Sequence, residues 1–230
     1  MPQRAPDGGV AAPAVPEDRL DGDWERVEDV TETLFGVQGA DVRGHTVVYE
    51  DRDLRAAVRT ATDGRVDQSW RFFFATRLAF RPPLAPAIGP AMVLPSVKTE
   101  AVRQFADDLG DRGVANVERG RRERVRTESR SRVSLRQVTG ELSTGDDAVP
   151  VEGWVGAWAD SGIHLAGGAY PRTSLAEYFE SDGHGTDTGA DGGDVLGDGA
   201  GEDETDVNLL LARRSSDYRT NLLDLVRAVG

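Results

Sequence analysis

Alternating hydrophobic and polar positions are clearest between Trp70 and Phe80, in the sequence WRFFFATRLAF. Read at a period of two residues, one face is rich in aromatic side chains and the other carries Arg71 and Arg77. Aromatic side chains on one face would bury a large apolar area. The pattern predicts a long strand that is buried on one face, partly solvated on the other, and central to the core. The face predicted to be buried carries Trp70, Phe72, Phe74, Thr76, Leu78 and Phe80.

Upstream of this strand, residues 24–35 fit either a helix or a strand, and their β-branched residues favour a strand. Residues 42–50 predict a further strand. Asp51 then offers an N-cap for a helix that continues to Thr60, with Leu54 among the apolar residues of one face.

Residues 82–95 follow the central strand and contain five prolines. Proline at this density favours an ordered loop over a helix or a ladder strand. Leu84 and Ile88 are apolar residues of this loop, and they either cover the core or present a surface to a partner. Ser96 is the predicted N-cap of a helix that runs to Leu109.

From residue 114 to residue 170 the chain has the pattern of a β-meander of four strands. A short helix over 175–179, a last strand over 207–212 and a terminal helix capped by Ser216 complete the prediction. These elements predict one α+β domain over residues 24–230. Its antiparallel sheet of about six to eight strands would be backed by two or three helices, as in an α/β/α sandwich.

Charge is distributed unevenly along the chain, whose net charge is −13. Residues 1–23 are rich in Pro, Gly and Asp, and residues 180–206 hold ten acidic residues with no Lys or Arg. Both segments are predicted to be disordered, as a tail and an insert. Lys98 is the only lysine among 27 basic residues. Acid excess with little lysine favours a halophilic protein, and an acidic protein from a high-GC genome is the alternative.

Several function classes are disfavoured by what the sequence lacks. With no cysteine there is no disulfide, thiol nucleophile or Cys-based metal site. The first residues lack the apolar core of a signal peptide, and no apolar run approaches the ~20 residues that cross a bilayer. We therefore expect a soluble, cytoplasmic protein without a membrane span.

The strongest candidate contact residues are arginines. On a strand, Arg122, Arg124 and Arg126 would share one face, where they could grip a small anion or an acidic protein partner. The alternative is a solvated face on which these arginines pair across strands with glutamates such as Glu118, Glu123 and Glu128. Nucleic acid is disfavoured as a partner, because its binding weakens in concentrated salt.

No catalytic, cofactor or metal residue is predicted. Asp187, Asp191, Asp194 and Asp198 match a calcium loop only in part, and a solvating insert is favoured. His45, His164 and His184 share no ligand spacing. An enzyme acting on a small anion, with Glu152 or His164 as its acid or base, remains an alternative to a binding or scaffold protein.

Several stretches together resemble an uncharacterised protein family of haloarchaea. They are GHTVVYEDRDLR (44–55), WRFFFATRLAFRPPLAPAIGPAM (70–92), QFADDLGDRG (104–113), VERGRRERVRT (117–127) and VEGWVGAWADSGIHLAGGAYP (151–171). The resemblance implies no activity and no site residues. The order of predicted elements is similar to that of PsbP and Mog1-like α/β/α sandwiches, which implies binding rather than catalysis. The leading hypothesis is a non-catalytic binding or scaffold module that uses its sheet face or the proline-rich loop 82–95.

Overall fold

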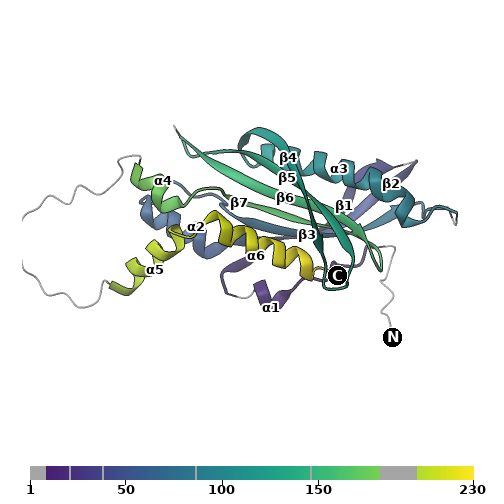
Figure 1. Ribbon diagram of the computed structural model, residues 1–230, viewed down its shortest axis with the longest axis horizontal. Helices are drawn as coiled ribbons and strands as arrows, with labels where there is room; N and C mark the ends of the chain where they lie inside the picture. Colours follow the sequence, from purple (N-terminus) through teal and green to yellow (C-terminus); the bar gives the residue numbers. More distant parts are fainter. Residues whose placement is uncertain (1–8, 21, 38, 86, 146, 182–200) are drawn as a thin grey trace, which may run out of the picture.

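A computed structural model describes residues 9–20, 22–37, 39–85, 87–145, 147–181 and 201–230. In it, seven strands form one antiparallel sheet with the order β1-β2-β3-β7-β6-β5-β4 (Figure 1). This confirms the predicted α+β domain with an antiparallel sheet. The strands are β1 (Trp24–Val37), β2 (Ala40–Asp51), β3 (Phe72–Arg81), β4 (Val114–Arg126), β5 (Arg132–Ser143), β6 (Ala148–Ala159) and β7 (Ile163–Pro171).

Helices lie on both faces of this sheet. The helix α3 packs mainly against β6 on one face, and α6 packs against β7 and β3 on the other (Figure 1). The described helices outnumber the two or three that were predicted, because short helices add to these layers. They are α1 (Glu17–Leu20), α2 (Arg52–Ala61), α3 (Pro90–Asp111), α4 (Leu175–Ser181), α5 (Gly201–Leu211) and α6 (Ser215–Ala228).

The first half of the central strand β3 is covered on both faces, whereas one face was predicted to be partly solvated; Arg77 and Ala79, further along that face, are half-buried. Phe73 and Ala75 are completely buried on the face predicted to be solvated, and Arg71, just before the strand, is also buried. Phe74, on the face predicted to be buried, is only half-buried. The alternation was right, but it could not show that helices from two later segments cover both faces.

The proline content predicted a loop up to Pro95, but the loop ends earlier. The helix α3 already begins at Pro90, where a missing backbone N–H is harmless, and it continues through Pro95. Its inner stripe is buried against the sheet and consists of Val93, Val97, Ala101, Phe105 and Leu109. Ser96 therefore lies inside the helix and is not its N-cap.

The helix α3 approaches the sheet closely because β6 carries a glycine beneath it. A methyl group placed at Gly153 would lie 2.8 Å from Cζ of Phe105. The absence of a side chain at this position therefore fixes the height of α3 above the strand.

The acidic segment before the terminal helix is also partly helical. Residues 201–211 form α5, whereas disorder up to 206 and a strand over 207–212 were predicted. Val207, Leu210 and Leu211 recur at helical spacing and pack against the main core, and α5 contacts α2 and α4. The aspartates that match a calcium loop only in part (Asp187, Asp191, Asp194 and Asp198) and most of the predicted insert lie outside the described residues.

Two smaller differences concern the ends of the chain. Arg214 is the N-cap of α6, and Ser216 lies within the helix, where its hydroxyl contacts the Asp217 carboxylate. Near the N-terminus, Val10 and Leu20 are buried and residues 17–20 form α1, whereas a disordered tail was predicted up to residue 23.

Candidate functional site

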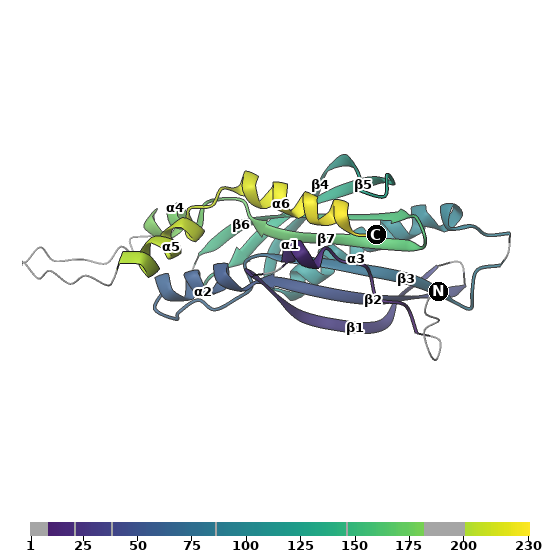
Figure 2. The same cartoon turned by 90° about the horizontal axis from the view of Figure 1, so that it is seen from below.

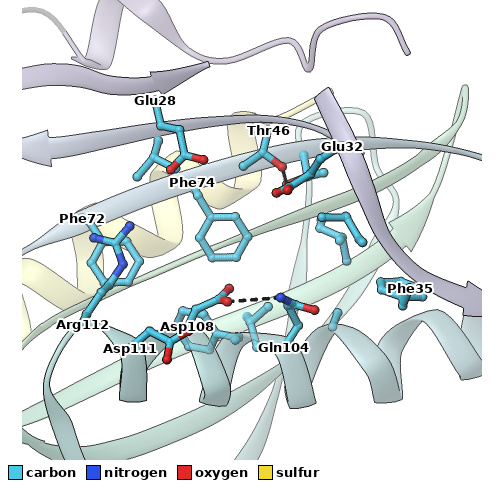
Figure 3. Close-up of a pocket in the computed structure, with 17 residues that line it drawn as sticks. Glu28, Glu32, Phe35, Thr46, Phe72, Phe74, Gln104, Asp108, Asp111 and Arg112 are labelled. Atoms are coloured by element: carbon cyan, nitrogen blue, oxygen red, sulfur yellow. Dashed lines mark hydrogen bonds between the residues drawn. The ribbon is translucent and has the colours of Figure 1, made fainter. Parts of the chain in front are cut away.

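A pocket of about 320 Å³ opens between α3 and the part of the sheet formed by β1, β2 and β3 (Figure 3). Its walls come from segments far apart in the sequence, because α3 crosses back over the first strands after the proline-rich segment. The pocket is lined by Glu28, Glu32, Leu34, Phe35, Thr46, Val48, Phe72, Phe74, Thr76, Ala101, Gln104, Phe105, Asp108, Asp111, Arg112, Val155 and Leu165.

The floor of the pocket is aromatic. Phe72 and Phe74 come from alternate positions of β3, so both point toward α3. Phe105 descends from α3, and its ring centroid lies 5.7 Å from that of Phe74 and 6.3 Å from that of Phe72. The three rings form an apolar surface that the helix does not fully cover.

Two threonines add the polar part of the floor. Thr46 and Thr76 lie on neighbouring strands, and their hydroxyl oxygens are 2.9 Å apart in a hydrogen bond. Thr76 is buried, so its polar group is satisfied by Thr46. Among the described residues, this shared hydrogen bond is the one that the structure gives to each hydroxyl.

The rim of the pocket is acidic. Glu28 and Glu32 share one face of β1, and Asp108 and Asp111 lie three residues apart at the end of α3 (Figure 3). Within the described part of the chain, none of these four carboxylates forms an ion pair with Lys or Arg. The rim therefore presents negative charge to whatever enters.

Arg112 is the one basic side chain that lines the pocket, and it is already engaged. Its guanidinium carbon lies 4.5 Å from the centroid of the Phe72 ring. Its Nη1 lies 3.6 Å from Oε1 of Glu50, outside the pocket. This position shows that a cation is accommodated on the aromatic floor.

The surroundings of Asp108 shift the pKa of its carboxyl group. Burial among neighbouring groups raises the pKa of Asp108, and a hydrogen bond from the Gln104 amide (3.3 Å) opposes this increase. A cation that binds beside such a carboxylate stabilises its ionised form.

The predicted arginine site lies elsewhere. Arg122, Arg124 and Arg126 are exposed on β4 at the far edge of the sheet, on the face that α3 occupies. The alternative, in which these arginines pair across strands with glutamates, is not found among the ion pairs of the described residues. Glu123 points to the opposite face and pairs with Arg219, and Glu128 pairs with Arg19.

Leu84 and Ile88, the other predicted contact residues, are half-buried. They pack against an apolar cluster beneath the first half of α3, which contains Val93, Val97, Leu78 and Ile163. Their position fits the covering role, and a partner contact there remains a prediction.

The candidate acid and base are separated from the pocket. Glu152 accepts hydrogen bonds from Tyr170, Trp154 and Gln137. Burial opposes its ionisation, but these hydrogen bonds together lower the pKa of Glu152. His164 is completely buried and stacked on Trp158 with a centroid distance of 5.6 Å.

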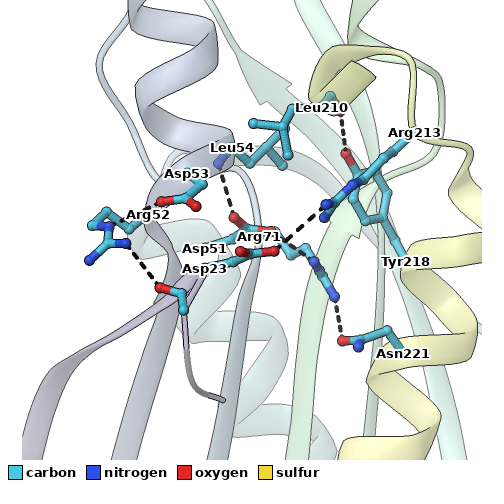
Figure 4. A network of polar contacts seen from close by, with 11 residues as sticks. Asp23, Asp51, Arg52, Asp53, Leu54, Arg71, Leu210, Arg213, Tyr218 and Asn221 are labelled. Carbon is cyan, nitrogen blue, oxygen red and sulfur yellow. Dashed lines mark hydrogen bonds and ion pairs between the residues drawn. The ribbon is translucent and has the colours of Figure 1, made fainter. Parts of the chain in front are cut away.

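A buried ion pair on the α6 face was missed, because Arg71 was placed on a solvated face. Arg71 donates hydrogen bonds to Asp51 and Asn221, and the ring of Tyr218 lies beside it (Figure 4). Its guanidinium carbon is also 4.5 Å from the centroid of the Trp24 ring. Burial lowers the pKa of Arg71, and Asp51 opposes that shift. The apolar context of WRFFF gave a signal that this arginine needs an internal partner.

The protein is an α+β domain in which a seven-stranded antiparallel sheet lies between two layers of helices. A pocket opens on one face of the sheet, beneath α3. The chain belongs to the family described as Domain of unknown function (DUF6517), which matches residues 12–230. Searches of curated proteins and of solved structures found no match. The likeness to PsbP and Mog1-like proteins therefore stays a prediction, as does the haloarchaeal origin. Among the described residues, no helix has the length and apolar character required to span a membrane.

Proposed function

We propose that the protein is a non-catalytic binding module whose sheet face, beneath α3, takes a small organic cation that carries an apolar group. The observation that carries this proposal is the division of one pocket into an aromatic floor and an acidic rim. Each half matches a different part of such a ligand.

The aromatic floor would hold the apolar part of the ligand. Phe72, Phe74 and Phe105 offer ring faces and edges at the base of a pocket of about 320 Å³. Pockets for small ligands begin at about 300 Å³, so the ligand is a small one. Ring faces also attract cations, as the position of Arg112 over Phe72 illustrates.

The rim would hold the charge. Glu28 and Glu32 face Asp108 and Asp111 across the opening (Figure 3). Because Arg112 is engaged with Glu50, an entering ammonium group would meet mainly negative charge. An entering carboxylate or phosphate would be repelled. The pocket therefore favours a cation over the small anion considered from the sequence.

The lining residues support binding more than catalysis. Besides apolar side chains they comprise carboxylates, one amide, one arginine and two threonines, and the threonine hydroxyls bond to each other. Glu152 and His164, the candidate acid and base, do not line the pocket. Arrangements for nucleophilic catalysis place a nucleophile beside its base, which this lining does not do.

Isothermal titration calorimetry with phenethylammonium tests the proposal, because this probe has one ring and one charged amine. We expect it to bind, and we expect its uncharged analogue 2-phenylethanol and the anion 3-phenylpropionate to bind much more weakly. Equal binding of the amine and the alcohol, or no binding of any of the three, would contradict the proposed function.

Matched variants locate the binding. Glu32→Gln and Asp108→Asn each remove one rim charge and should weaken amine binding roughly tenfold, as expected for the loss of a charged hydrogen bond. Asp107→Asn removes an equal charge from the neighbouring position, where the carboxylate pairs with Arg103 on an exposed helix surface. We expect Asp107→Asn to leave the affinity unchanged.

A further inference from the structure

The two edge strands of the sheet carry opposite charge. The strand β1 pairs only with β2, and β4 pairs only with β5, so each has one unpaired side within the described residues (Figure 2). Acidic residues dominate β1, which contains Glu25, Glu28, Asp29 and Glu32 beside Arg26. Arginines dominate β4, which contains Arg119, Arg121, Arg122, Arg124 and Arg126 beside Glu118 and Glu123.

From this complementarity we infer that copies of the chain associate head to tail, with β4 of one copy lying beside β1 of the next and continuing the sheet. Exposed edge strands can add a further strand through their free backbone groups. This inference shares Glu28 and Glu32 with the rim of the pocket, but it requires no ligand there.

The directions of the strands allow this association. All neighbouring strands of the sheet are antiparallel, so β1 and β4, at the first and seventh positions, run in the same direction. A second copy displaced along the sheet would therefore place its β1 parallel to β4. In that arrangement the α3 faces of both copies lie on the same side.

The charged side chains then meet on one face. Glu28 and Glu32 point to the α3 side, because they line the pocket beneath α3. Arg122 and Arg124 point to the same side, because Arg122 pairs in register with Arg136 and Arg136 with Val155, which also lines that pocket. On both strands the charges recur at multiples of two residues, so their repeats match.

These side chains are also available. Arg122, Arg124 and Glu32 are exposed, and Glu28 is partly exposed. Within the described part of the chain, no ion pair engages any of these four residues. Fixed charges at the edge without internal partners are free to pair with a second molecule.

Bulges limit the contact to two short windows. Register shifts interrupt β1 before Glu28 and after Thr33, and they interrupt β4 before Arg122. Bulges twist an edge and disfavour pairing there, which leaves regular ladders over 28–33 and 122–126. The regular stretch of β1 contains Glu28 and Glu32, and the regular stretch of β4 contains Arg122 and Arg124.

Pairing between two identical edges is disfavoured. Two copies of β4 would bring arginine beside arginine, and two copies of β1 would bring carboxylate beside carboxylate. A heterologous contact uses different surfaces of each copy and does not close on itself as a symmetric dimer would. Association should therefore continue beyond the dimer as the protein concentration rises.

Sedimentation velocity of the full chain tests the inference. At about 0.1 M salt the Debye length is about 10 Å, so the overall net charge is screened while close pairs still attract. We expect the average mass to increase with concentration at this salt and to fall toward the monomer in 1 M salt. A mass that stops at a dimer, or a monomer under both conditions, would overturn the inference.

Charge-swap variants make the test specific. Arg122→Glu with Arg124→Glu makes both edges acidic, and Glu28→Arg with Glu32→Arg makes both edges basic. Each variant alone should lose at least roughly tenfold in association constant, whereas an equimolar mixture of the two should associate again. Recovery in the mixture also shows that both variants are folded, and failure of the mixture to associate would overturn the inference.

A control and a competing partner complete the design. Arg81→Glu with Arg214→Glu makes the same charge change at exposed positions outside both windows, and this variant should associate like the unaltered chain. A fluorescent oligothymidine distinguishes a nucleic-acid site. Binding of the oligonucleotide that depends on Arg122 and Arg124, without self-association, would overturn the inference in favour of nucleic acid.

Discussion

Nη1 of Arg71 lies 2.7 Å from Oδ2 of Asp51, and the two side chains are only 5% and 0% exposed. The pair joins the end of β2 to the residue before β3, and Asn221 extends it to α6 (Figure 4). Asp51 has a second role, since its Oδ1 accepts a hydrogen bond from the Leu54 amide and caps α2. The Asp51 carboxylate therefore both caps α2 and neutralises the buried guanidinium of Arg71.

Arg71→Met should lower the free energy of unfolding by about 3–5 kcal/mol, because Asp51 would be left buried without its counterion. Urea unfolding measures this loss. Arg55→Met is a matched control, because its ion pair with Asp67 is exposed and should contribute less than about 1 kcal/mol. Equal losses in both variants would contradict the special role of the buried pair.

Gly153→Val should destabilise the domain and also disturb the pocket, because the new side chain would collide with Phe105 and lift α3. Gly110→Ala is the control within α3 itself, since nothing lies within 4 Å of a Cβ at that position. Alanine there should stabilise the helix by up to about 1 kcal/mol. Thermal unfolding of both variants gives the two opposite shifts, and stability unchanged by Gly153→Val would be inconsistent with the close approach.

Leu84→Asp combined with Ile88→Asp should unfold the domain if these residues cover the apolar cluster beneath α3. Burying two carboxylates without partners is strongly unfavourable. Circular dichroism and the unfolding midpoint report the result. A variant that remains fully folded would contradict the covering role.

His164 should make stability depend on pH between neutrality and mild acid. Burial lowers the pKa of His164 below its ordinary value of 6.5, Arg77 adds to this effect and Asp160 opposes it. The folded chain therefore keeps the imidazole neutral while the unfolded chain protonates it. The stability present above about pH 6.5 is lost as the pH falls toward the lower, folded pKa.

Urea midpoints measured from pH 8 to pH 5 test this dependence. The variant His164→Phe keeps a ring against Trp158 but cannot be protonated, so its midpoint should fall less over this range. The same decrease in both proteins would assign the acid sensitivity to other groups.

Binding of phenethylammonium in the pocket should weaken as the pH falls. Burial raises the pKa of Asp108, so this carboxylate takes up its proton at a higher pH than an ordinary aspartate. A cation binds the ionised form, so affinity is lost from that higher pH downward. Calorimetry at several pH values measures the loss, and the decrease should begin at lower pH in Asp108→Asn. An unchanged profile in that variant would exclude Asp108 as the titrating group.

The sequence was sufficient to predict what depends on local patterns. Alternation predicted a strand over 70–80, where β3 begins at Phe72, and Asp51 was correctly expected to cap the helix that follows β2. Composition was misleading where tertiary packing decides, since residues 201–206 belong to α5, and Pro90 and Pro95 belong to α3. Local pattern does not report which segments later cover a helix or a sheet face.

The pocket could be predicted only in part. Phe72 and Phe74 were correctly placed on the face of β3 that carries the predicted core. Glu28 and Asp108 reach the same pocket only because α3 crosses back over β1, a relation between distant segments that periodicity does not contain. The arginines of β4 were found by their spacing, but the ion pair between Glu123 and Arg219 of α6 was not.

The place of β7 in the sheet has a consequence for how the chain folds. Because β7 lies between β3 and β6, it joins the three strands of the first half to the three strands of the second. Phe72 pairs with Ala169, so this contact closes a long loop of chain. A pairing between strands so far apart in the sequence forms slowly, because the entropy of closing the loop is lost before the contact is gained. During synthesis, the first three strands must therefore wait for the last one, and until it leaves the ribosome the apolar side of β3 is a surface that chaperones can bind.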